Sequence, residues 1–199
     1  MFKKLFNPFT HIAGIRSLFW GVKIILITSI LGYFLNIHFP DVISVKSVPS
    51  FPFLYHVLQS FSNWIIISLI LITISLIFSK SKIRIIDIFG TQALARFPYL
   101  LATFTGIPKS PQVFSQYMLY KYLGTGDPVE ITTLDITITI FIILFSLLLT
   151  IWMIALMYNA FKVSSNIKGT KSIVLFIVGL IISMVISTLI TNQLILIYS

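Results

Sequence analysis

The strongest constraint on this chain is a long apolar stretch close to its C-terminal end. From Ser172 to Ile197 the sequence contains no charged residue and consists mainly of Ile, Leu and Val. A helix needs about 20 mainly apolar residues to cross the hydrocarbon core of a bilayer. Backbone polar groups find no water there, so a helix satisfies them within one segment. The stretch therefore predicts a transmembrane helix.

Four further segments are apolar enough to be read in the same way. The chain has 199 residues, of which 57% are hydrophobic and only 10% charged, whereas a soluble domain carries about 25% charged residues. We therefore expect an all-α polytopic transmembrane bundle, formed by residues 1–199 as a single membrane domain. It would have about five spans, and its first residues, 1–16, would lie in the interface, interrupted by Pro8. The expected spans are 18–37, 61–78, 85–107, 135–161 and 172–197.

The segment 85–107 differs from the others because it contains Asp87, Gln92 and Arg96 and a proline, Pro98. Proline lacks the N–H that a helix interior requires, so the hydrogen-bond ladder is expected to break there. Ionisable groups within a span are costly and usually have a partner or a task. We therefore take Asp87, Gln92 and Arg96 as a candidate intramembrane polar site.

Two interpretations of this site stay open. In the first, Asp87 caps its helix, and Arg96 bonds backbone carbonyls or polar groups of neighbouring helices. In the second, Arg96 binds an anionic group such as a lipid phosphate or a partner's carboxylate, because a guanidinium suits those anions. Gln92 and Arg96 are four residues apart and would share one helix face.

The distribution of basic residues predicts how the chain is oriented. With five spans and the N-terminus in the cytoplasm, ten Lys and Arg residues outside the spans' interiors fall on the cytoplasmic side, and three fall outside. Cytoplasmic loops carry the excess of Lys and Arg. The ten are Lys3, Lys4, Arg16, Lys23, Lys80, Lys82, Arg84, Lys162, Lys168 and Lys171, and the three are Lys46, Lys109 and Lys121. We expect a cytoplasmic N-terminus and a location in the bacterial inner membrane.

Six of these basic residues are candidate cytoplasmic contacts for anionic lipid or an acidic partner, or simple topology anchors. They are Lys80, Lys82, Arg84, Lys162, Lys168 and Lys171.

Small residues recur every four positions on the last span and at wider intervals on the first, which lets helices approach closely. These stripes serve either packing within the bundle or self-association. They are Gly179, Ser183, Ser187 and Thr191 on the last span, and Gly14, Gly21, Thr28 and Gly32 on the first.

Several kinds of chemistry find no support in the sequence. The chain contains no cysteine, which excludes disulfides and thiolate chemistry. His38, Asp41 and His56 fall in one predicted outer loop without a metal-ligand spacing, so we expect no metal. No catalytic motif is present, and we expect no enzyme activity and no cofactor. The net charge of +9 is attributed to membrane anchoring, and no nucleic-acid partner is expected.

Two stretches resemble the Yip family of Ypt-interacting membrane proteins. In Asp87 to Leu100, small residues precede Arg96-Phe97-Pro98, and in Trp152 to Gly179 a span ends in a basic connection before a final apolar span. The resemblance covers roughly residues 60 to 195 and implies five spans with the N-terminus inside. It also implies a place among proteins whose eukaryotic members act in vesicle trafficking and contact Rab-type GTPases. This chain lacks their Asp-Leu-x-Gly-Pro motif, and its sparse loops resemble those of bacterial members.

Two functions follow as expectations. One is a non-enzymatic scaffold or adaptor that binds lipids or another membrane protein, or associates with itself. The other is a transporter or permease subunit with a polar path near Gln92 and Arg96. A water-filled cavity that reaches Arg96 from one side of the membrane favours the transporter, and a bundle packed shut around it favours the scaffold.

Overall fold

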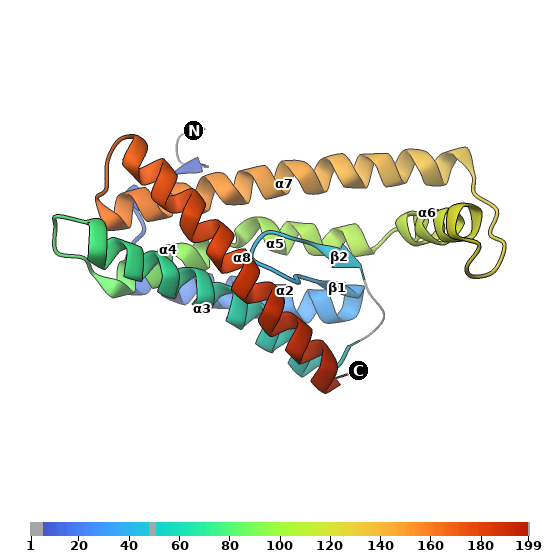
Figure 1. Ribbon diagram of the computed structural model, residues 1–199, viewed down its shortest axis with the longest axis horizontal. Coiled ribbons are helices and arrows are strands. Elements are labelled where there is room, and N and C mark those ends of the chain that lie inside the picture. Colours follow the sequence, from blue (N-terminus) through green and yellow to red (C-terminus); the bar gives the residue numbers. More distant parts are fainter. Residues whose placement is uncertain (1–5, 48–50, 199) are drawn as a thin grey trace.

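The fold is an all-α bundle in which four helices are long and apolar enough to cross a membrane. The computed structural model describes residues 6–47 and 51–198. The four helices, within that part of the chain, are α2, α3, α7 and α8 (Figure 1). The elements in order are η1 (Pro8–Thr10), α2 (Ile15–Leu35), β1 (Ile37–His38), β2 (Lys46–Ser47), α3 (Phe53–Phe78), α4 (Ile85–Leu94), α5 (Phe97–Ala102), η2 (Thr103–Gly106), α6 (Ser110–Met118), the π-helical turn η3 (Leu119–Leu123), α7 (Thr133–Ser165) and α8 (Thr170–Tyr198). The predicted transmembrane helical bundle is thereby confirmed.

The ends of the longest helix, α7, are set by local chemistry. Thr132 precedes the helix, and its hydroxyl accepts a hydrogen bond from the backbone N–H of Asp135 at 3.1 Å. The Asp135 carboxylate accepts one in return from the Thr132 N–H, so two otherwise unpaired donors are satisfied. At the other end Asn166 adopts the left-handed conformation, with φ of 54°. The Thr132 cap makes the helix begin at Thr133, two residues before the predicted start at Asp135.

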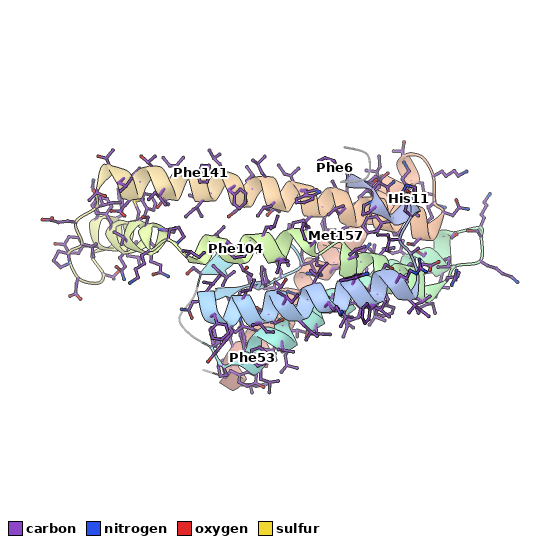
Figure 2. The ribbon with its side chains drawn as sticks, turned by 180° about the vertical axis from the view of Figure 1, so that it is seen from behind. Phe6, His11, Phe53, Phe104, Phe141 and Met157 are labelled. Atoms are coloured by element: carbon purple, nitrogen blue, oxygen red, sulfur yellow. The ribbon has the colours of Figure 1, made fainter. Side chains whose placement is uncertain are left out.

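The outer surfaces of the helices are apolar. Phe141 is 68% exposed on α7 and Leu196 is 73% exposed on α8, and large apolar side chains are exposed along both helices. Figure 2 shows side chains projecting from both sides of α7, along which Phe141 lies. A soluble monomer rarely exposes such contiguous apolar surface. Hydrocarbon is therefore the solvent that these helices suit.

The segment 85–106 runs beside α2 in the same direction but is broken into three short helices. Two glycines of the segment lie directly against the backbone at the two ends of α2. A Cβ atom added to Gly90 would lie 2.7 Å from the Gly14 carbonyl oxygen, and a Cβ atom added to Gly106 would collide with the Leu35 carbonyl oxygen. The segment therefore follows α2 from its beginning to its end. α4 ends at Leu94, and Pro98 lies in the first turn of α5, where a missing N–H does no harm. The segment thus has the expected break, whereas the number of spans and the orientation stay predictions.

The last helix, α8, packs antiparallel against α3. A Cβ on Gly179 would lie 2.7 Å from the Ile74 Cδ1, and at the other end the rings of Tyr55 and Tyr198 lie 6.3 Å apart. Each residue of the predicted α8 stripe is buried inside the single chain, namely Gly179, Ser183, Ser187 and Thr191. Packing within the bundle, the first of the two interpretations, therefore accounts for this stripe.

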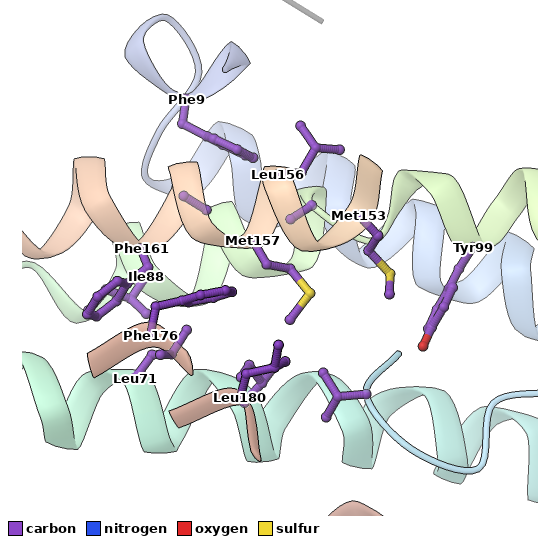
Figure 3. Close-up of a cluster of buried hydrophobic side chains, with 14 of the residues drawn as sticks. Phe9, Leu71, Ile88, Tyr99, Met153, Leu156, Met157, Phe161, Phe176 and Leu180 are labelled. Carbon is purple, nitrogen blue, oxygen red and sulfur yellow. The ribbon is translucent and has the colours of Figure 1, made fainter. Parts of the chain in front are cut away.

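One hydrophobic core joins the helices. Leu71 of α3, Ile88 of α4, Met157 of α7 and Phe176 of α8 meet there (Figure 3). Phe9, from the chain before α2, is 1% exposed and belongs to the same core. It had been placed in an interfacial segment over residues 1–16, of which residues 1–5 lie outside the described part of the chain. From Asn7 to Gly14 the structure has one 3-10 turn, from which Phe9 packs inward onto the core, and the interfacial location of the segment stays a prediction.

The second long helix begins earlier than the sequence indicates. α3 starts at Phe53, whereas the span was predicted from Phe61. The added turns carry Tyr55, His56 and Gln59, all of which are buried. Polar residues at a predicted loop–helix boundary normally face water, and here they face a loop of the same chain. That arrangement creates the site described next.

Candidate functional site: a buried polar cluster around Arg96

The polar cluster is built from α3, α5 and the connection between α2 and α3. Asn63 of α3 donates from its Nδ2 to the carbonyl oxygens of Phe39 at 2.6 Å and Asp41 at 3.0 Å. Gln59, one helical turn earlier, accepts the Phe39 N–H on its Oε1 at 2.9 Å. The two amide side chains therefore bond the loop backbone much as a neighbouring strand would. They pair backbone polar groups of loop residues that the packing buries.

Arg96, just before α5, joins this arrangement from the other side. Its Nη2 donates to the carbonyl oxygen of Asn63 at 2.9 Å, and its guanidinium carbon lies 5.5 Å from the centre of the Tyr99 ring. The Tyr99 hydroxyl in turn donates to the Asp41 carbonyl oxygen at 3.3 Å. Arg96 is only 3% exposed. Its Nε and Nη1 have no hydrogen-bond partner.

His38 forms the outer part of the cluster. Its Nδ1 lies 2.8 Å from the Tyr55 hydroxyl, which also accepts a hydrogen bond from Gln59 Nε2 at 2.8 Å. Burial lowers the pKa of His38 from 6.5 to about 4, and the neighbouring His56 and Lys46 lower it further in the same direction. The imidazole is therefore neutral near pH 7. It acts as a hydrogen-bonding group and carries no positive charge there.

The Asp41 side chain bonds backbone groups of its own loop. The Asp41 carboxylate accepts hydrogen bonds from the N–H groups of Ile43 at 2.8 Å and Ser44 at 3.0 Å, so it folds back onto its own loop. Among the residues that the structure describes, no group of three or more His, Asp or Glu side chains could hold a metal ion.

The three polar residues singled out in the sequence have separate environments. Asp87 lies in the first turn of α4 and pairs with Arg84 at 3.7 Å. Gln92 is buried, and its Nε2 donates to the Met157 carbonyl oxygen of α7 at 3.0 Å. Arg96 contacts α3. Gln92 and Arg96 do not share a helix face as expected, because α4 ends between them at Leu94.

The six basic candidates lie together at one end of the molecule. Lys80, Lys82 and Arg84 lie on or beside the α3–α4 connection, and Lys162, Lys168 and Lys171 lie near the α7–α8 connection. All six are exposed. Figure 1 shows both connections at the same end, with the C-terminus pointing towards the other. The structure therefore gathers two separate sequence clusters into one surface, which we call the basic end.

Sequence reasoning missed Tyr55, Gln59, Asn63 and Tyr99. Gln59 and Asn63 were missed although they are four residues apart and therefore share a helix face. That spacing is the one signal that could have identified them. Their partners, Phe39 and Asp41, are 20 to 24 residues away in the chain, and no periodicity reports such a contact.

These features define the class of the protein, which is that of multi-pass integral membrane proteins. Four helices are suited to cross a bilayer, their outer faces are apolar, and their polar side chains bond inside the bundle. Comparisons with protein-family models, with curated proteins and with solved structures find no match to this chain.

Proposed function

We propose that this chain is a non-enzymatic membrane scaffold or adaptor of the Yip type, in the bacterial inner membrane, which binds anionic lipids or another membrane protein. The closed environment of Arg96 carries this proposal. The cavity beside it, lined also by Ile25, Thr28, Ser60 and Tyr99, measures about 10 Å³, which is room for about one water molecule. A solute path would need a wider, wetted opening. The packing therefore favours the scaffold over a transporter with a path near Gln92 and Arg96.

The basic end supplies the lipid-binding surface of the proposal. Its six exposed cations come from two connections at the same end of the bundle. A basic residue next to a membrane contributes about 1 kcal/mol of attraction to anionic lipid. Lys171 also lies 5.0 Å from the Phe78 ring, so its stem is held against α3. The surface is suited to headgroups of negative charge at one face of the bilayer.

Lipid that co-purifies in mild detergent tests this surface. We expect anionic phospholipid to be enriched relative to zwitterionic lipid by native mass spectrometry. The double variant Lys168→Gln/Lys171→Gln should lose most of the enrichment, because it removes two of the six cations. The matched control is Lys109→Gln/Lys121→Gln, which removes the same charge from the predicted outer side. If both double variants retain equal anionic lipid, the basic end is not the lipid-binding surface.

Affinity purification of the full chain from membranes separates scaffold from transporter. The scaffold predicts a membrane protein or lipid in stable association that persists when Gln92 is replaced by leucine, since the Gln92 side chain is buried and bonds the Met157 carbonyl oxygen inside the bundle. A stoichiometric ATPase or channel subunit in the eluate would instead support the transporter and contradict the scaffold.

A further inference from the structure

A small cavity lies beside Arg96 where α2, α3 and α5 meet. Its walls are Ile25 and Thr28 of α2, Ser60 of α3, Arg96, and Tyr99 of α5. Three of these five residues carry a hydroxyl group and one carries a fixed positive charge. Most of the surface that faces the cavity is apolar. Its polar character comes from the buried Arg96 guanidinium and the Thr28 hydroxyl, which have donors without a partner.

The guanidinium of Arg96 has unused hydrogen-bonding capacity at this cavity. Only Nη2 has a partner, the carbonyl oxygen of Asn63, while Nε and Nη1 have none. The Thr28 hydroxyl, also buried, has none either. Each unpaired buried donor loses its hydration without replacement, which costs about 1–3 kcal/mol and more for a charged group. These groups together indicate that something accepts hydrogen bonds here.

Arg96 has no carboxylate in ion-pair contact. Within residues 6–47 and 51–198 the only ion pair joins Arg84 and Asp87, at the start of α4. Asp41 acts on Arg96 electrostatically, but its carboxylate accepts hydrogen bonds from the N–H groups of Ile43 and Ser44. Buried charges in proteins are normally paired, and water in the cavity would accept a hydrogen bond without balancing the charge. A negative occupant would do both.

We propose that this cavity binds a monovalent anion of halide size, with chloride the natural occupant, between Arg96 and the hydroxyls of Thr28 and Ser60. A halide is only slightly larger than a water molecule, so small movements of the lining suffice. Phosphate and carboxylate groups have several heavy atoms and exceed the space. The site locks α2, α3 and α5 together around one ion. It is independent of the proposed binding of lipid or protein.

Thermal unfolding of the purified full chain tests the proposal. At constant ionic strength and pH, chloride is replaced stepwise by gluconate, which is too large for the cavity. We expect the unfolding temperature to rise with chloride in a saturable manner, because an ion that binds only the folded state stabilises it. Bromide should have the same effect. An unfolding temperature that is the same in chloride and gluconate overturns the proposal and leaves water as the occupant.

Two threonine variants make the test specific. Thr28→Val keeps the shape of the side chain and removes the cavity hydroxyl, and it should weaken the apparent halide affinity about tenfold. Thr73→Val is the control, because the Thr73 hydroxyl is exposed on α3 and bonds its own helix at Leu69. Equal halide affinity in the two variants contradicts the proposal. Arg96→Gln should abolish the response altogether.

Because Arg96→Gln can fail to fold, a direct measurement accompanies it. Crystals of the wild-type chain grown in bromide should show an anomalous peak between Arg96 and Thr28. The peak should weaken in Thr28→Val and persist in Thr73→Val. A featureless cavity in the bromide wild-type crystals overturns the proposal regardless of the variant data.

Discussion

At the scale of single residues, the buried amide and guanidinium side chains of this bundle bond backbone groups of other segments. Asn63 and Gln59 hold the loop at Phe39, Arg96 bonds the carbonyl of Asn63, and Gln92 bonds that of Met157. Such bonds are directional, whereas apolar contacts in lipid are not. They therefore select one arrangement of the helices from many that would be equally apolar.

Asn63 provides the sharpest test of this role. Asn63→Leu removes two hydrogen bonds, and it leaves the buried Phe39 carbonyl without the one from Asn63, while the Asp41 carbonyl keeps the one from Tyr99. We expect a loss of about 2–4 kcal/mol in unfolding free energy, measured by denaturant unfolding in detergent. Asn159→Leu is the control, since its single bond to the Phe6 carbonyl lies at an exposed site, and should cost less than about 1 kcal/mol. Similar losses would contradict the assigned role.

His38 predicts a pH dependence of stability. Its pKa is about 4 in the folded protein against 6.5 when unfolded, so the unfolded chain binds more protons between these values. The contribution of neutral His38 to the unfolding free energy is complete above pH 6.5 and is lost as the pH falls towards 4. With screening, the loss should reach no more than about 2 kcal/mol. Thermal unfolding from pH 7.5 to 4.5 measures it.

His38→Gln should flatten that pH profile between 6.5 and 4.5. His11→Gln, at an exposed position before α2, should leave the profile as it is in the wild type. A profile that is equally steep in His38→Gln would mean that another group controls the acid sensitivity.

At the scale of elements, α2 and α4 run parallel with their backbones in close contact. A Cβ on Gly21 would lie 2.6 Å from the Ala93 backbone carbonyl carbon. Backbone cannot move aside as a side-chain tip can, so a larger residue forces the two helices apart. A Cβ on Gly179 would instead meet the flexible tip of Ile74. Gly21 and Gly179, one from each predicted stripe, therefore differ in how well their sites can accommodate a larger side chain.

This difference predicts unequal mutational costs. Gly21→Ala should destabilise by about 1–3 kcal/mol through overpacking, lowering the unfolding temperature and the yield of folded protein in detergent. Gly179→Ala should have a smaller effect, because Ile74 can change its rotamer. Both variants are measured by thermal unfolding monitored by circular dichroism. Equal shifts would argue against the backbone contact at Ala93.

The elements also show what the sequence can and cannot predict. Apolar length predicted the bundle, and α7 and α8 begin and end within a few residues of expectation, because lipid imposes a requirement that composition alone meets. Pro98 predicted the break in 85–106 because its missing N–H is a property of the residue itself and needs no distant partner. The start of α3 was missed because Tyr55 and Gln59 are buried by a loop that packs on them from a distance in sequence. The burial of Phe9 could not be predicted, because its partners lie on α7, more than 140 residues away.

At the scale of the whole molecule, the basic end makes the distribution of positive charge along the bundle asymmetric. The connections that carry Lys80 and Lys168 lie at one end, while the C-terminus points towards the other. Because basic loops favour the cytoplasm, the chain is expected to be oriented with its N-terminus inside and its C-terminus outside. α7, with 33 residues, is about 50 Å long and exceeds a hydrocarbon core of about 30 Å, so it tilts or protrudes.

Reporter fusions test this orientation. A cytoplasm-active fluorescent protein should be bright at the N-terminus and dark at the C-terminus, and a periplasm-active phosphatase should give the reverse pattern. Reporters inserted in the α3–α4 connection should behave as the N-terminal fusion does. If both ends report the same compartment, the segment 85–106 does not cross the membrane and the chain has an even number of spans.

The parallel run of 85–106 along α2 has a consequence for biosynthesis. A segment with Asp87, Gln92 and Arg96 partitions poorly into lipid by itself, since each charged residue near a helix centre costs about 2.5–3.5 kcal/mol during insertion. It follows α2 and α3 out of the ribosome, and it packs closely on Gly21 of α2 through Ala93. We therefore expect the first helix to remain beside the insertion machinery until the third segment arrives, and to serve the nascent chain as a template.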